Sequence, residues 1–248
     1  SYKKYQDYAK QALPEPKMIQ EKIHPYEIVG NITMLAAVAG LLGAKIFHNL
    51  ENLDAFFADP IGQLLSFSGL TFYGGLICGA AVVIWYGKKH NIHYTHIADA
   101  AAPGLMLAYG IGRLGCHFAG DGCWGEFNSC DIPDQISFLP NWIWHYDYKN
   151  AVVGPPGGLV YPTAIYESIM AFLLFSFLWI IRKRITIPGM LFGIYLIVNG
   201  LERFIIEKIR INTTYNIFGK EISQAEIISF LLILTGFSII IYLKRSKK

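Results

Sequence analysis

The sequence predicts an all-α polytopic membrane protein, a helix bundle, and three observations support this fold class. Hydrophobic residues make up 53% of the 248 residues and charged residues only 16%, too few charges for the surface of a soluble domain. The apolar residues gather in runs of about 20, the length that crosses about 30 Å of hydrocarbon. Basic residues cluster between these runs, as they do at a membrane surface.

Six apolar runs are long enough to form transmembrane helices. They cover residues 27–50, 69–87, 97–115, 162–181, 188–206 and 225–243. Basic clusters follow the second, fourth and sixth runs, at residues 88–89, 182–184 and 244–248. The positive-inside rule places these clusters in the cytoplasm. Alternation then places residues 49–68, 116–161 and 207–224 on the periplasmic side.

Residues 1–26 form a polar segment before the first apolar run. Five lysines in this stretch agree with a cytoplasmic or interfacial location, and residues 2–23 could form a helix on the membrane surface. Residues 27–248 are expected to form the transmembrane domain, with residues 116–161 as its periplasmic arm. The net charge of +3 gives no reason to expect nucleic acid as a partner.

Polar side chains recur near the outer ends of four expected helices. Each costs about 2.5–3.5 kcal/mol at the centre of a membrane helix, so their clustering at one depth indicates a function. These residues are Tyr73, Arg113, Tyr161, Tyr166, Glu167, Arg203 and Glu207.

The fifth expected helix carries three charges on one face. Arg203, Glu207 and Arg210 follow a spacing of four and then three residues, so Glu207 can pair with either arginine. One interpretation is a structural ladder of ion pairs at a helix end. The other is a phosphodiester site, because a guanidinium held by one carboxylate still has free donors.

Residues 112–125 combine five glycines with Arg113 and Asp121. Three of the glycines, Gly120, Gly122 and Gly125, fall within six residues, which helix packing alone rarely requires. A turn there could direct backbone N–H groups at an anionic ligand.

Four motifs resemble, in order, those of the phosphatidylglycerol:prolipoprotein diacylglyceryl transferase family. The first is Tyr73-Gly74-Gly75-Leu76-Ile77, followed by Asp99. The second is Arg113-x-Gly115-Cys116-x-x-x-Gly120-Asp121-x-x-Trp124-Gly125. The third is Tyr161-Pro162-Thr163-x-x-Tyr166-Glu167, and the fourth is Arg203-x-x-x-Glu207-x-x-Arg210.

The resemblance implies a lipid-dependent transferase in the bacterial cytoplasmic (inner) membrane, with its active site facing the periplasm. Such an enzyme moves the diacylglyceryl group of phosphatidylglycerol to the lipobox cysteine of a prolipoprotein and releases glycerol phosphate, in lipoprotein biosynthesis. Its partners are phosphatidylglycerol, the prolipoprotein signal peptide and the lipid bilayer. No cofactor and no metal are implied.

The candidate site follows residue by residue from the motifs. Arg113 and Arg203 match the essential arginines of the family, and Glu207 matches their partner acid. With Tyr73 they form the expected catalytic set. The expected substrate-binding residues are Gly74, Gly75, Asp99, Cys116, His117, Gly120, Asp121, Gly125, Tyr166 and Arg210.

Two departures from the family pattern leave alternatives open. Tyr73 stands where well-known members carry a histidine, and a phenol is a poor base at neutral pH. His117 could serve instead, or it could be an ordinary interfacial histidine. An N-terminal helix of the family has no counterpart before residue 27, so we expect a seventh helix upstream. The alternatives are an inert paralogue that binds phospholipid or signal peptide in a membrane assembly, or an enzyme with another acceptor.

The cysteines allow several arrangements. Cys78 lies within an expected helix and suits a small core residue. Cys116, Cys123 and Cys130 recur every seven residues, and one disulfide with one thiol left over is possible. A zinc site with His117 is disfavoured because the short cysteine pair typical of such sites is missing.

The outer segment of residues 126–160 is rich in aromatic residues and contains a Gly/Pro run at residues 154–158. It could be an interfacial belt that rests on lipid headgroups, or a mobile arm that admits the signal peptide.

Overall fold

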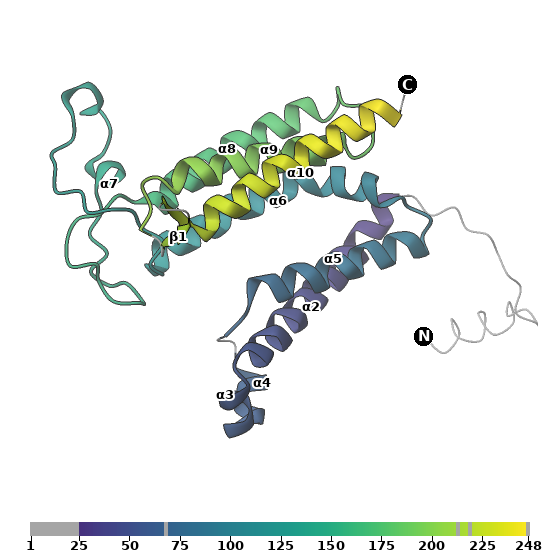
Figure 1. The fold of residues 1–248 in the computed structure, drawn as a ribbon, viewed down its shortest axis with the longest axis horizontal. Coiled ribbons are helices and arrows are strands. Elements are labelled where there is room, and N and C mark those ends of the chain that lie inside the picture. Colours follow the sequence, from purple (N-terminus) through teal and green to yellow (C-terminus); the bar gives the residue numbers. More distant parts are fainter. Residues whose placement is uncertain (1–24, 67–68, 212–213, 218–219, 247–248) are drawn as a thin grey trace, which may run out of the picture. The chain divides into compact units, whose positions relative to one another are not determined.

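The computed structural model describes residues 25–66, 69–211, 214–217 and 220–246 (Figure 1). The chain divides into two compact units, with the boundary after His90. The first unit contains α2 (Pro25–Glu51), α3 (Leu53–Ala58), α4 (Pro60–Leu65) and α5 (Phe72–Lys89). The second contains α6 (Tyr94–Ala119), η1 (Asp134–Ile136), α7 (Asn141–Trp144), α8 (Thr163–Ile181), α9 (Met190–Ile206), β1 (Thr214–Ile217), β2 (Lys220–Ser223) and α10 (Gln224–Ser246).

Each of the six expected spans corresponds to one long helix, α2, α5, α6, α8, α9 or α10. By length and apolar composition, three described helices could cross a membrane: Ile28–Glu51, Thr163–Ile181 and Gln224–Arg245. The mostly helical class is therefore confirmed, whereas the number of spans and the periplasmic side stay predictions. The hairpin of β1 and β2 is an addition to the all-α prediction. The surface helix expected over residues 2–23 lies outside the described residues.

In the first unit, α2 and α5 lie side by side with their backbones in close contact (Figure 1). A Cβ atom on Gly74 would lie 2.5 Å from the carbonyl oxygen of Gly43, and one on Gly75 would lie 3.1 Å from that of Gly40. Cys78 packs against Gly43, as a small core residue does. Helix packing therefore accounts for both glycines that the sequence assigned to substrate binding.

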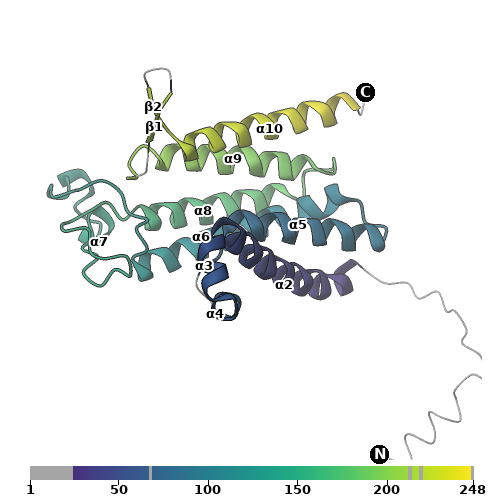
Figure 2. The same cartoon turned by 60° about the horizontal axis from the view of Figure 1, so that its bottom comes forward.

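In the second unit, α6, α8, α9 and α10 run alongside one another (Figure 2). The buried centre of the unit consists of Ala102, Met106, Ala171, Leu178 and Leu191. The hydroxyl of Ser168 on α8 donates to the carbonyl of Gly110 on α6 at 2.9 Å. This bond and the small side chains bring α6 and α8 close together, and the candidate site lies at the C-terminal end of α6 and the N-terminal end of α8.

The start of α9 is fastened to α6 by one carboxylate. Asp99 accepts hydrogen bonds from the backbone N–H groups of Gly189 at 2.6 Å and Phe192 at 2.8 Å. Four N–H groups at a helix start lack partners within the helix, so a carboxylate there stabilises it. Asp99 therefore stabilises the start of α9. The sequence predicts only a substrate-binding role for it.

We predict that Asp99→Ala lowers stability by about 0.5–2 kcal/mol, the usual loss for a helix cap. The measurement is the thermal unfolding midpoint of the detergent-purified protein. Asp131→Ala removes an exposed acid from the outer arm and should leave the midpoint unchanged. Equal midpoints for wild type and Asp99→Ala would contradict the capping role.

Candidate functional site

The centre of the candidate site is the carboxylate of Glu167, which is fully buried near the start of α8. Its Oε2 atom lies 2.6 Å from Arg113 Nε and 3.6 Å from Arg203 Nη1, and it accepts a hydrogen bond from the Tyr109 hydroxyl at 2.5 Å. Its Oε1 atom accepts from Arg210 Nη1 at 3.3 Å. We call Glu167 with Arg113, Arg203 and Arg210 the arginine cluster.

Two contacts in this cluster arise from the spacing of residues within single helices. Tyr109 and Arg113 are four residues apart on α6, and the guanidinium carbon lies 5.0 Å from the centre of the phenol ring. Arg203 in the last turn of α9 and Glu207, the residue directly after α9, have the same spacing, and their side chains lie 3.2 Å apart. The expected pair of Arg203 with Glu207 is therefore confirmed.

The structure adds two glutamates to the site. Glu167 was recognised as part of a motif but was not assigned a role, since its partners lie on other helices. Glu202 is 3% exposed, and neither of its carboxylate oxygens makes a hydrogen bond to any described residue. A buried acid without a well-formed hydrogen bond is unfavourable, and the positive charges of Arg203 and Arg113 offset part of that cost.

The glycine-rich segment has a different task from the one expected. The N–H groups of Gly120, Cys123 and Gly125 bind the Cys116 carbonyl, the Asp121 carboxylate and the Tyr161 carbonyl, at 3.0, 3.1 and 2.9 Å. These three N–H groups are therefore used within the protein and are not directed at a ligand.

Gly120 and Gly125 are needed for backbone geometry. Gly120 ends α6 with a φ of 61°, a conformation that favours glycine. A Cβ atom on Gly125 would lie 2.5 Å from the carbonyl oxygen of Ile209. Gly125 also forms an isolated antiparallel bridge with Arg210. The turn thereby positions the backbone of an arginine in the cluster.

The thiol of Cys123 also contacts this cluster. Its sulfur accepts hydrogen bonds from Arg113 Nη1 at 3.4 Å and from Arg210 Nη2 at 3.0 Å. Burial raises the pKa of this thiol, and its hydrogen bond to Asp121 adds to the rise. Burial alone would raise the pKa of Asp121, but hydrogen bonds from Cys116 and Cys123 hold it below its usual range. Asp121 is therefore a carboxylate that accepts from two thiols.

All four cysteines are free thiols. The sulfurs of Cys116 and Cys123 and an oxygen of Asp121 lie within 4.8 Å of one another. His117 is occupied elsewhere, since its Nδ1 atom lies 2.7 Å from the hydroxyl of Tyr148. In a zinc site of His117 with the cysteines, the imidazole would bind the metal. In this structure its Nδ1 atom contacts Tyr148 instead.

His117 lies in the last turn of α6, among aromatic side chains. Its ring packs edge-on against Phe118, Tyr146 and Tyr148, with ring centres 4.7 Å apart for Tyr146. Burial lowers the pKa of His117, so the imidazole is neutral at pH 7. A neutral imidazole can accept a proton at its second nitrogen.

Other expected residues have separate positions. The Tyr166 hydroxyl donates to the carbonyl of Ile143 at 2.5 Å and thus fastens the outer arm to α8. Asp99 lies at the opposite end of α6 from Arg113. Tyr73 belongs to α5 of the first unit and is 49% exposed. Its expected catalytic role stays a prediction.

The arrangement is suited to binding an anion. Three guanidinium groups from different segments converge on one buried carboxylate, which fixes their positions. Arg203 Nη1 and Arg210 Nε are buried and make no hydrogen bond to the described part of the chain. A phosphate oxygen is the kind of acceptor that suits such donors.

Two buried glutamates provide a matched test of this geometry. We predict that Glu167→Gln destabilises the protein by about 3–5 kcal/mol, because it leaves three guanidinium groups without their shared carboxylate. Glu202→Gln should have a smaller effect or stabilise the protein, since an amide costs less to bury without a partner than a carboxylate does. The measurement is the thermal unfolding midpoint in detergent. A larger loss for Glu202→Gln than for Glu167→Gln would refute the central role of Glu167.

Comparisons with known proteins show the family of this chain. The sequence profile of the family described as prolipoprotein diacylglyceryl transferase matches residues 9–242. Relatives named phosphatidylglycerol–prolipoprotein diacylglyceryl transferase include the following three. The protein of Dehalococcoides mccartyi is 29% identical, with 90% of this chain and 80% of the relative covered. That of Leptospira interrogans is 28% identical, with 88% and 80% covered. That of Streptococcus sanguinis is 30% identical, with 92% and 84% covered. The chain therefore belongs to the prolipoprotein diacylglyceryl transferase family of transferases.

Proposed function

We propose that this chain transfers the diacylglyceryl group of phosphatidylglycerol to the lipobox cysteine of a prolipoprotein and releases glycerol phosphate. The reaction takes place at the periplasmic face of the inner membrane. Membership of the family and the names of the relatives support this proposal. The observation that carries it is the convergence of Arg113, Arg203 and Arg210 on Glu167.

The chemistry requires stabilisation of a leaving phosphate. A carbon–sulfur bond forms at a glycerol carbon of the lipid, and the bond from that carbon to a phosphate oxygen breaks. The electron pair of the broken bond stays on the phosphate oxygen, so negative charge grows on the leaving group. Guanidinium groups that are already fixed stabilise this charge without reorganising during the reaction.

The arginines divide this task. Arg203 is held by Glu207 on its own helix, which leaves Nη1 directed at the centre of the cluster. Arg113 reaches the same carboxylate oxygen of Glu167 from α6. Arg210 is positioned by the backbone bridge with Gly125. A lipid phosphate that accepts from Arg203 and Arg210 would partly replace their contacts with Glu167.

The thiol of the acceptor must also lose a proton. We assign His117 as the proton acceptor, because its imidazole is neutral and lies three residues before Gly120 in the same motif. In this role Nδ1–H donates to the Tyr148 hydroxyl, which fixes the orientation of the ring and leaves the lone pair of Nε2 to accept the proton.

We predict that Arg203→Ala lowers the transfer rate by about 100-fold or more, a typical loss for a donor that stabilises a developing oxyanion. The measurement is transfer of labelled diacylglycerol from phosphatidylglycerol to a lipobox peptide. Lys208→Ala is the control, since Lys208 is exposed on the next turn and pairs with Glu226. Equal transfer by wild type and Arg203→Ala would remove the enzymatic proposal. Binding of lipid and peptide with no transfer by the wild type would favour an inert paralogue.

The role of His117 predicts a pH dependence. Because burial lowers its pKa below the ordinary value of 6.5, the base is neutral at pH 7 and becomes protonated only in more acidic solution. The transfer rate should therefore be constant near neutrality and fall as the pH drops below about 6.5. His117→Gln should lower the rate and remove this acidic limb. An unchanged profile in His117→Gln would assign the proton to another group.

A further inference from the structure

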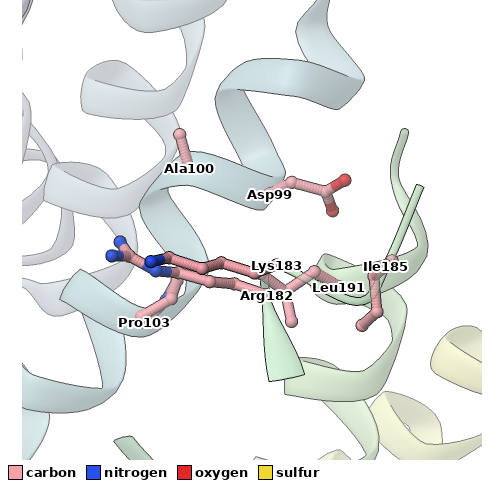
Figure 3. A pocket seen from close by; sticks show the side chains of 7 residues that line it. All are labelled: Asp99, Ala100, Pro103, Arg182, Lys183, Ile185 and Leu191. Carbon is pink, nitrogen blue, oxygen red and sulfur yellow. The ribbon is translucent and has the colours of Figure 1, made fainter. Parts of the chain in front are cut away.

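A pocket lies at the end of the second unit opposite the arginine cluster (Figure 3). It is formed by the first turns of α6 and by the connection between α8 and α9. Two cations, Arg182 and Lys183, and one acid, Asp99, line it. Its apolar lining consists of Ala100, Pro103, Ile185 and Leu191. Asp99 and Arg113 are 14 residues apart on α6, which corresponds to about 21 Å along the helix. The pocket is therefore separate from the site described above.

The charge inside this pocket is positive. In Figure 3 the head groups of Arg182 and Lys183 lie side by side, whereas the carboxylate of Asp99 points away from them. Both oxygens of Asp99 already accept hydrogen bonds from the start of α9. Within the described ranges, neither Arg182 nor Lys183 forms an ion pair. Two neighbouring cations without an acid to neutralise them favour an anionic ligand.

The surroundings of the pocket are apolar. The guanidinium of Arg182 lies over the ring of Trp179, 3.1 Å from its centre. Along α8, away from the pocket, Phe177, Trp179 and Ile180 are exposed. This exposed face belongs to a helix that is apolar enough to cross a membrane. An anionic head with apolar chains therefore fits these surroundings better than a free anion does.

We propose that this pocket binds the phosphate group of an anionic glycerophospholipid whose acyl chains lie along α8. Arg182 and Lys183 contact the phosphate, and Pro103, Ile185 and Leu191 contact the glycerol end of the chains. Under the positive-inside rule the lipid belongs to the cytoplasmic leaflet. It is thus a second lipid, distinct from the one that reacts at the arginine cluster.

The test compares lipid binding by variants of the chain in native mass spectrometry. The probes are dioleoyl phosphatidylglycerol, dioleoyl phosphatidylcholine and inorganic phosphate. Arg182→Gln/Lys183→Gln should bind about one phosphatidylglycerol fewer per chain, with affinity for that lipid about 30-fold weaker. Phosphatidylcholine binding should not change, and millimolar inorganic phosphate should not displace the lipid.

Two control variants make the result specific. Arg184→Gln/Arg245→Gln removes the same charge from the same end of the bundle without changing the pocket lining, and should bind as the wild type does. The charge-retaining Arg182→Lys/Lys183→Arg should keep most of the binding. Equal phosphatidylglycerol binding by the wild type and the Gln/Gln variant would overturn the proposal. The proposal would also be overturned if the Gln/Gln variant lost phosphatidylcholine binding to the same extent. Displacement of phosphatidylglycerol by inorganic phosphate would overturn it too.

The same preparations separate this proposal from the proposed enzymatic activity. With saturating phosphatidylglycerol, Arg182→Gln/Lys183→Gln should keep its transfer rate, because the pocket is remote from the arginine cluster. Lost binding with retained transfer supports the second lipid site. Lost transfer together with lost binding in this variant would contradict the separation of the two sites.

Discussion

The buried carboxylate of Glu167 is the interaction on which the second unit depends. A buried charge is tolerated only when several partners compensate it. The partners of Glu167 come from α6, α9 and the segment after α9. Each partner is in turn fixed by a local contact. Tyr109 lies beneath Arg113, Glu207 pairs with Arg203, and Gly125 holds the backbone of Arg210. Helix positions and charge positions are therefore set by the same contacts.

This arrangement gives a physical reason for a carboxylate at the centre of the proposed phosphate site. Three unpaired guanidinium groups would repel one another and would each adopt several conformations. Glu167 offsets this repulsion and reduces the number of conformations, so a phosphate meets donors that are already in place. The thiol of Cys123 takes further donors from Arg113 and Arg210 without adding a charge, because its raised pKa keeps it protonated at neutral pH.

The sequence predicts the parts of this structure that depend on local patterns. Apolar runs predict the six long helices, and the spacing of four residues predicts the pair of Arg203 with Glu207. Contacts between distant segments are not encoded in such patterns. Glu167 therefore remained without a role, although it opens an apolar helix that otherwise has no acid. The glycine-rich turn depends on such a distant contact too, since a side chain at Gly125 would meet the carbonyl of Ile209, 84 residues further along the chain.

The shared carboxylate also limits which substitutions this protein can accept over evolution. Since three arginines share one acceptor, loss of any one alters the electrostatic balance for the other two, and the effects of their substitutions will not add. Replacement of Glu167 by a neutral residue becomes tolerable only after an arginine has been lost. The order in which these four positions mutate therefore matters, and a lineage that drifts toward an inactive form has few first steps open to it.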